Sequence, residues 1–222
     1  MTDGTLLLLW IVVLACGLGS VVALHGLGLR ATYARDLLHV GTGIWVLGWP
    51  SWSQPILPGA LVVGAAAMTA LVPLTSRRLV LAARFQQSVS EGDERYHGLV
   101  LYTLAYAGFT WIGLTREPFP AAAALLALSL GDGLGGAVGR RVGRTFYSAP
   151  GGKRKSLEGS AVVAVMAAAG AALAAMWFHT PVDPWLIVAL GVIAALAEAL
   201  SPRGSDNAVV PTAVWLGAVL LM

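Results

Sequence analysis

Long apolar runs separated by short polar stretches are the main pattern along the chain. Eight such runs cover most of the sequence, at residues 5–24, 37–49, 56–74, 98–114, 119–139, 159–178, 185–200 and 208–222. A helix needs roughly 20 apolar residues to cross a bilayer, so the second, seventh and eighth runs are short for a straight span. The pattern therefore predicts an all-α, polytopic membrane protein with seven or eight transmembrane helices, in a single domain that covers residues 1–222.

The composition supports a protein that lies within a membrane. Of the 222 residues, 57% are hydrophobic and only 11% are charged, which is too little polar surface to cover a soluble globule. The net charge of +3 is small, and in a membrane protein such an excess favours a topology signal over nucleic-acid binding. A single cysteine, Cys16, excludes an internal disulfide. We expect the membrane, and no nucleic acid, as a partner.

The positions of the basic residues predict an orientation. Positively charged loops stay on the cytoplasmic side of a membrane. With the N-terminus outside, every one of the 14 Lys and Arg residues except Arg116 falls in a cytoplasmic loop. Frequent alanine, glycine and arginine fit a bacterial protein, so the expected location is a bacterial cytoplasmic membrane, with the basic loops facing the cytoplasm.

The most informative stretch is glycine-rich and basic, at residues 129–160, where the fifth apolar run ends. Six of the fourteen Lys and Arg residues lie in it: Arg140, Arg141, Arg144, Lys153, Arg154 and Lys155. Glycines let backbone N–H groups approach phosphate oxygens, cations offset the charge of a polyanion, and carboxylates hold the bridging divalent metal. The stretch therefore predicts a site for a nucleoside triphosphate.

These glycines also fit other patterns. Gly135, Gly139 and Gly143 recur every four residues, so on a helix they would form one smooth face for close helix packing, and this alternative stays open. A G-x-G-x-x-G string begins at Gly131, but a dinucleotide site requires a βαβ unit, which the apolar runs leave no room for. The G-x-x-x-x-G-K-[ST] phosphate loop is also absent, because Lys153 is followed by another basic residue.

The string GDGLGGAVGRRVG at 131–143, followed by KRKSLEGS at 153–160, resembles the shared motif of the CTP-dependent lipid-alcohol kinases. This family includes dolichol kinase, phytol kinase and the CTP-using diacylglycerol kinase, and the length of the chain is closest to phytol kinase. The resemblance implies transfer of the γ-phosphate of CTP to a lipid hydroxyl, with Mg²⁺ as cofactor. Phytol, another isoprenoid alcohol, a polyprenol and diacylglycerol all remain possible acceptors, and the preference for CTP over ATP rests on the resemblance alone.

Two further regions match the family. Arg35, Asp36 and His39 lie three or four residues apart, so a helix brings them to neighbouring surface, either as a functional site or as an interfacial cluster. The family has R-K-x-x-H here, and Asp36 stands where its lysine would be. Near the C-terminus, E-A-L-S-P followed by D-N adds Glu198, Asp206 and Asn207, although Asn207 could instead cap the last helix.

These residues make up the predicted site, with roles from the resemblance and from residue chemistry. The expected catalytic residues are Asp132, His39, Lys155 and Glu158. The expected nucleotide-binding residues are Gly131, Gly133, Gly135, Gly139, Arg140, Gly143, Arg144, Lys153, Ser156, Gly159 and Ser160. The expected metal ligands are Asp132, which could alternatively act as the base, with Glu158, Glu198, Asp206 and Asn207.

The polar candidates all fall at the predicted cytoplasmic ends of their segments, which favours one site at that membrane surface. Two other functions fit some of these features. A cytidylyltransferase that makes CDP-lipids also uses CTP, but its K-D-x-G and H-G-G-x-x-D-R elements are absent here. A small transporter would be expected to place its polar residues near the bilayer midplane. Release of CDP, rather than of pyrophosphate, would identify the kinase.

Overall fold

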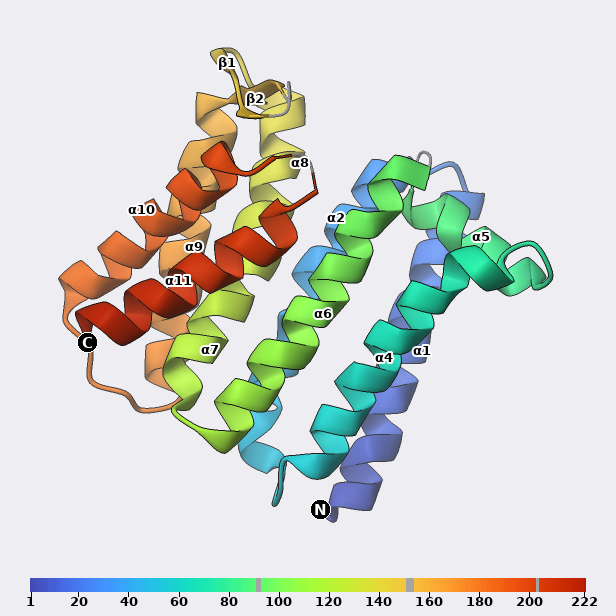
Figure 1. The fold of residues 1–222 in the computed structure, drawn as a ribbon, viewed down its shortest axis with the longest axis horizontal. Coiled ribbons are helices and arrows are strands. Elements are labelled where there is room, and N and C mark those ends of the chain that lie inside the picture. The colour runs from blue at the N-terminus through green and yellow to red at the C-terminus, as the bar shows by residue number, and fades with distance from the viewer. Residues whose placement is uncertain (91–92, 151–153, 203) are drawn as a thin grey trace.

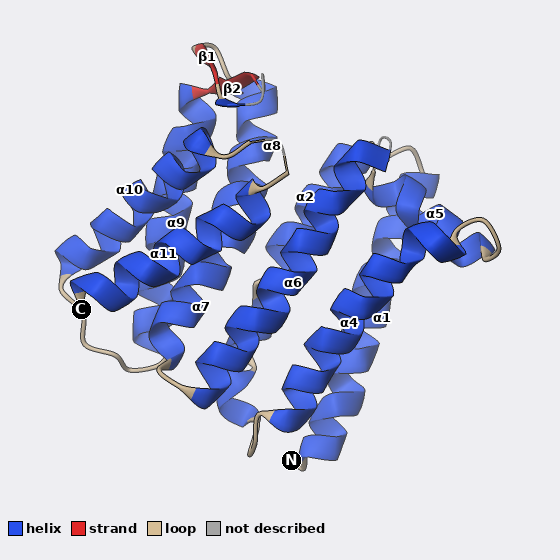
Figure 2. Cartoon of the chain, in the orientation of Figure 1, coloured by secondary structure: helices blue, strands red, loops and turns tan. Residues whose placement is uncertain are grey.

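The computed structural model describes residues 1–90, 93–150, 154–202 and 204–222, and it is mostly helical, as predicted (Figure 2). The first half contains α1 (Asp3–Gly26), α2 (Ala31–Thr42), α3 (Ile44–Leu47), η1 (Trp49–Ser51), α4 (Ile56–Thr75), α5 (Val80–Val89) and α6 (Asp93–Thr115). The second half contains α7 (Pro118–Leu126), η2 (Ala127–Asp132), α8 (Gly133–Val142), β1 (Phe146–Ser148), β2 (Arg154–Ser156), α9 (Leu157–Trp177), α10 (Pro184–Leu200) and α11 (Asp206–Leu221).

Five helical stretches among the described residues are long and apolar enough to cross a membrane. They are Asp3–Gly26, Ile56–Thr75, Tyr96–Thr115, Pro118–Val142 and Leu157–Trp177. The fourth joins α7, η2 and α8 end to end. Helices α10 and α11 are apolar but shorter. Membrane embedding thus follows from length and composition, whereas the predicted count of seven or eight spans depends on how the short helices lie in the bilayer.

The predicted run at 37–49 is divided in the structure. Helix α2 ends at Thr42, and α3 and η1 continue the chain after Gly43. A Cβ atom at Gly43 would lie only 2.7 Å from the Ser129 hydroxyl of η2. Glycine therefore permits η2 to approach α2 closely at the point where α2 stops.

Helix α7 is the centre of the molecule. Nearly every side chain from Phe119 to Leu128 is fully buried, and α7 packs against α6, α9 and α11 (Figure 1). A helix that is apolar on all sides is stable only when neighbours cover all of it. Because α7 continues through η2 into α8, this central position also fixes where Asp132 lies.

Successive long helices run in alternating directions (Figure 1). The ends of several helices therefore gather at the same end of the bundle. The β1–β2 hairpin lies at that end, beside α8, at the top of Figure 1. Its strands are antiparallel, with Phe146 opposite Ser156 and Tyr147 opposite Lys155. The basic stretch predicted from the sequence is therefore divided between the end of α8, this hairpin and the start of α9.

Candidate functional site

A polar pocket of about 340 Å³ lies at the hairpin end of the bundle, between α2 and α6 on one side and α8 to α11 on the other. We call it the polar pocket. It gathers ionisable and amide side chains from segments far apart in the sequence: Arg35, Asp36, His39, Asp132, Arg140, Arg154, Lys155, Glu198, Asp206 and Asn207. Most of the predicted site residues that carry charge are thus brought together.

Three carboxylates converge in this pocket. Asp132, Glu198 and Asp206 each offer an oxygen, and these oxygens all lie within 4.8 Å of one another. They come from the end of η2, the last turn of α10 and the first residue of α11. Glu198 and Asp206 are buried, and Asp132 is partly exposed. We call these three residues the carboxylate triad.

The local structure of each element explains this convergence. Asp132 closes η2, a short π-helix between two α-helices, and such wide turns are frequent at functional sites because they shift the side chains that follow. Asp206 begins α11 directly after the turn that contains Gly204, whose φ of +81° suits glycine. Glu198 lies three residues before the cap of α10, so its side chain reaches the same end of the bundle.

Lys155 is buried against the triad. Its Nζ lies 2.6 Å from Glu198 Oε1, and it also donates a hydrogen bond to the backbone carbonyl of Glu198. The hairpin accounts for its direction, because successive strand residues point to opposite faces: Arg154 is exposed and Lys155 is buried. Ser156 then caps α9 by accepting a hydrogen bond from the Gly159 N–H at 3.1 Å. Lys155 is thus anchored by a strand on one side and a capped helix on the other.

A second ion pair crosses the pocket from α8 to α2. Arg140 pairs with Asp36, and its guanidinium lies 5.5 Å from the centre of the Tyr33 ring. Asp36 occupies the position where the family motif has a lysine. In this chain the acidic side chain binds a cation from the glycine-rich helix, so the two segments are held together by an ion pair.

Two buried side chains in the pocket have polar atoms with no hydrogen-bond partner among the described residues. They are both ring nitrogens of His39 and the Oδ1 atom of Asn207. The amide of Asn207 is oriented by donation from Nδ2 to the Gly98 carbonyl at 2.8 Å, which leaves Oδ1 as an acceptor. Buried polar atoms without partners are rare in native proteins and often mark the place of a water, an ion or a ligand.

The carboxylate triad and Asn207 fit a hard divalent cation. Mg²⁺ takes oxygen ligands, usually one or two carboxylates together with waters and phosphate oxygens. The triad supplies carboxylate oxygens, and Asn207, with an amide oxygen, lines the same pocket. Four of the five metal ligands expected from the sequence thus lie in this pocket, and Glu158 does not. Nearby cations, Arg35, Arg140, Arg154 and Lys155, can bind the oxygens of a phosphate chain.

The glycines of the motif mainly allow helices to pack closely. A Cβ at Gly135 would overlap the Val163 side chain and lie 3.0 Å from the carbonyl of Gly159. One at Gly139 would lie 3.3 Å from the Cα of Gly159, and one at Gly133 would lie 3.1 Å from the Cβ of His39. These three glycines therefore satisfy the packing alternative. Two of them, Gly135 and Gly139, also line the polar pocket.

The remaining motif glycines lie in similar close contacts. A Cβ at Gly131 would lie 3.3 Å from the carbonyl of Val163, and one at Gly143 would lie 2.7 Å from the Ser156 hydroxyl. Both glycines thus lie against α9 or its cap. Neither is among the residues described as lining the polar pocket.

Some predicted site residues lie elsewhere. The Glu158 carboxylate accepts hydrogen bonds from the Thr145 N–H at 3.1 and 3.3 Å, so in the described structure it secures the loop before the hairpin and is not part of the triad. Arg144 is exposed in that loop. Ser160 does line the pocket, with its hydroxyl 2.7 Å from that of Tyr147. Lys153 lies outside the described residues.

Sequence reasoning missed some residues that line the pocket. Gly98 contributes the carbonyl that orients Asn207, and Phe146 lies under the guanidinium of Arg154 at 4.2 Å. Strand alternation would place Phe146 and Arg154 on the face opposite Lys155, so it gives no signal that they line the pocket as well. No local signal marks Gly98, because its role depends on a residue 109 positions away.

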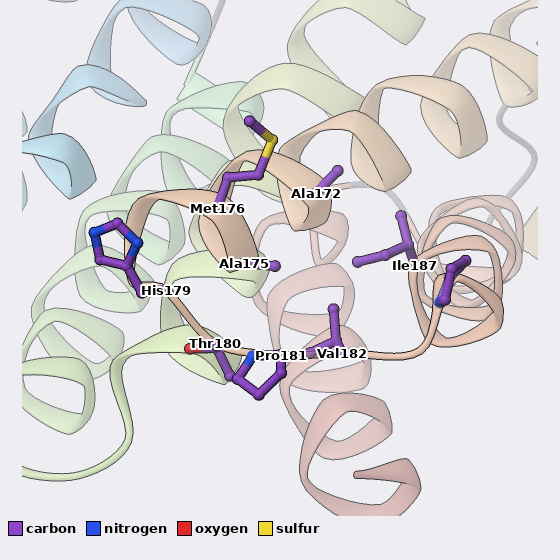
Figure 3. Close-up of a pocket in the computed structure, with 9 residues that line it drawn as sticks. Ala172, Ala175, Met176, His179, Thr180, Pro181, Val182 and Ile187 are labelled. Atoms are coloured by element: carbon purple, nitrogen blue, oxygen red, sulfur yellow. The ribbon is translucent and has the colours of Figure 1, made fainter.

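A larger pocket of about 830 Å³ lies at the turn between α9 and α10 (Figure 3). Its lining is mainly apolar and includes Ala172, Ala175, Met176, His179, Thr180, Pro181, Val182, Pro184 and Ile187. Size alone would favour it as a binding site. Phosphate and metal chemistry need charged groups, however, and these gather at the polar pocket.

The polar pocket therefore joins carboxylates, cations and buried polar atoms at one end of an apolar helix bundle, and some of these atoms have no hydrogen-bond partner in the described part of the chain. Such a combination suits reactions of a polyanion beside a membrane. No protein-family model, no curated protein and no solved structure matches the chain.

Proposed function

We propose that this chain is a membrane lipid-alcohol kinase that transfers the γ-phosphate of CTP to the hydroxyl of phytol, another isoprenoid alcohol, a polyprenol or diacylglycerol. The observation that carries the proposal is the convergence of Asp132, Glu198 and Asp206 beside Lys155, from four separate parts of the sequence. A cluster that combines a cation-binding group with basic side chains is what phosphoryl transfer requires. The motif at 131–160 supplies the choice of CTP and of a lipid alcohol.

The described residues suggest a role for each part of the site. Asp132, Glu198 and Asp206 would hold Mg²⁺, which when bound neutralises charge on the phosphate oxygens. Arg35, Arg140, Arg154 and Lys155 would bind the triphosphate chain. Lys155, now paired with Glu198, would also bind a phosphate oxygen. Because Lys155 directly precedes the α9 cap, the leaving CDP would then lie near that cap.

The transfer itself is an in-line displacement. The lipid hydroxyl oxygen forms a bond to the γ-phosphorus while the bond to the β–γ bridging oxygen breaks, and CDP leaves with that bonding pair. The hydroxyl proton goes to a ring nitrogen of His39, which has no hydrogen-bond partner among the described residues. His39 lies on α2 and the triad on η2, α10 and α11, and all four residues line the same pocket.

The proposal includes an orientation. We place the polar pocket at the cytoplasmic membrane surface, with the N-terminus outside and seven or eight spans in a bacterial cytoplasmic membrane. The concentration of Lys and Arg at the hairpin end supports this, since basic loops stay inside. At that surface a water-soluble nucleotide can meet the hydroxyl of a lipid whose chain remains in the bilayer.

The experiment is phosphoryl transfer in detergent from γ-labelled CTP, with labelled ATP alongside, to phytol, geranylgeraniol, a long polyprenol and diacylglycerol. We expect label in one of these lipids, from CTP in preference to ATP, together with release of CDP. Pyrophosphate release with phosphatidic acid as acceptor would instead make the protein a cytidylyltransferase. Absence of any nucleotide chemistry, with no stabilisation of the purified protein by CTP and Mg²⁺, would leave transport as the better explanation.

A further inference from the structure

His39 is held on two sides by residues that the proposed reaction does not use. On one side, the ring of Tyr102 on α6 lies 4.0 Å from the His39 ring, edge to face at 63°. On the other side lies Gly133, where even a single added carbon would come within 3.1 Å of the His39 Cβ. Both His39 and Tyr102 are only 3% exposed. His39 is therefore a buried side chain with its ring against α6 and its Cβ close to α8.

The backbone of His39 is held by the same neighbour. In a continued α-helix, the N–H of Gly43 would donate to the His39 carbonyl, but α2 ends here and that N–H donates to Val40 at 3.2 Å. Two hydroxyls replace it, since Thr42 Oγ1 donates to the His39 carbonyl at 2.8 Å and the Tyr102 hydroxyl donates to it at 3.1 Å. The two hydroxyls also contact each other. The helix break thus gives Tyr102 a backbone contact as well as a ring contact.

The break lies where η2 approaches α2. Gly43 lies so close to Ser129 that a Cβ would come 2.7 Å from its hydroxyl. The element that ends in Asp132 therefore contacts α2 at the same helix end where Tyr102 binds the His39 carbonyl. Contacts at the end of α2 thus connect the element that carries His39 with the element that carries Asp132.

We propose that Tyr102 is a positioning residue for His39. Its ring and hydroxyl hold the buried imidazole in place, and neither ring nitrogen has a hydrogen-bond partner among the described residues. This deepens the proposed function and rests on it for the role of His39. The neighbouring residue Tyr106 provides a contrast, because its buried hydroxyl has no hydrogen-bond partner among the described residues.

The test compares matched variants in the CTP-dependent transfer assay. Tyr102→Leu removes ring and hydroxyl, and kcat should fall by about 10- to 100-fold, the usual cost of losing a group that orients a functional side chain, while KM for CTP stays unchanged. Tyr102→Phe should retain the ring contact and give an intermediate kcat. Tyr106→Phe, the same change one turn along α6, should leave kcat at the wild-type value.

Coupling to His39 separates positioning from general damage. In a His39→Ala background, Tyr102→Leu should cause no further loss of kcat, because the group that it positions is already gone. Additive losses in the double variant, a change in KM for CTP equal to the change in kcat, or an equal effect of Tyr106→Phe would each overturn the proposal.

A second measurement does not depend on enzymatic activity. Diethylpyrocarbonate modification of each histidine, followed by mass spectrometry, should find His39 protected in the wild type relative to the exposed His97 and His179. Protection should be lost in Tyr102→Leu and kept in Tyr106→Phe. If the wild type transfers no phosphate, the kinase proposal fails alone, and this measurement still decides whether Tyr102 holds His39. Unchanged protection in Tyr102→Leu would refute the positioning role.

Discussion

The buried pair of Lys155 and Glu198 places two charges in a region with little water. Both side chains are nearly inaccessible, with exposed fractions of 5% and 12%. An ion pair in such a place contributes less than its short distance suggests, because both charges had to leave water. Loss of one partner is costly, since the other charge then remains buried without compensation.

We therefore predict that Lys155→Met lowers the free energy of unfolding by about 3–5 kcal/mol. The double variant Lys155→Met/Glu198→Leu should recover most of this loss, because no buried charge is then left unpaired. Reversible unfolding in mixed dodecylmaltoside and SDS micelles measures both. Arg144→Met, at an exposed position, is the control and should change stability by less than about 0.5 kcal/mol. A double variant no more stable than Lys155→Met would show that the two charges are not coupled.

For Asp132 we predict an effect on enzymatic activity and little effect on stability. Asp132→Asn keeps the shape of the side chain but removes one negative charge from the carboxylate triad. We expect initial rates of CDP release to fall by about 100-fold or more, with the melting temperature in detergent little changed. Glu117→Gln, an exposed acid at the other end of the bundle, should be fully active. Near-normal turnover in Asp132→Asn would remove this residue from the proposed mechanism.

Among the elements, α8 packs closely against α9 beside the site. Gly135 and Gly139 on α8 face Gly159 on α9, so the two backbones approach without intervening side chains. Small residues at such interfaces permit close contact between membrane helices. The spacing of four residues that suggested a smooth face for helix packing thus also brings Ser156 and Lys155 to the pocket.

Gly135→Ala should separate these two helices. Its Cβ would overlap Val163, and we expect a loss of about 1–3 kcal/mol in the free energy of unfolding, typical of overpacking. Gly108→Ala on α6 is the matched control, because no atom lies within 4 Å of its added carbon and alanine favours helix. Equal stability of the two variants would contradict the packing role of Gly135.

For the whole molecule, the gathering of basic residues toward the hairpin end predicts which side faces the cytoplasm. Ser148 in β1 and Glu117 at the N-cap of α7 are both exposed. The hairpin and the turn between α6 and α7 lie at opposite ends of the bundle (Figure 1). In a Cys16→Ser background, Glu117→Cys should react with a membrane-impermeant maleimide on intact cells, and Ser148→Cys only after the cells are permeabilised. The physical reason is the retention of basic loops on the cytoplasmic side. The reverse labelling pattern would place the site outside.

The sequence alone determined the class of fold. Runs of apolar residues near the length of a span leave helices as the structure that satisfies backbone hydrogen bonds in lipid, and the mostly helical architecture confirms this. Polar residues at the run ends also predicted which residues could meet, and Asp132, Lys155, Glu198 and Asp206 do so. These signals are local, since they depend on composition and spacing within about 20 residues.

Only the tertiary structure decided which of the candidates share a site. Glu158 and Ser156 lie two residues apart, yet the serine lines the pocket and the glutamate binds the backbone of Thr145. The contact of Asp36 with Arg140 spans 104 positions, and that of Tyr102 with His39 spans 63. Such contacts depend on how whole helices pack around α7, and this arrangement cannot be predicted from residue spacing along the chain.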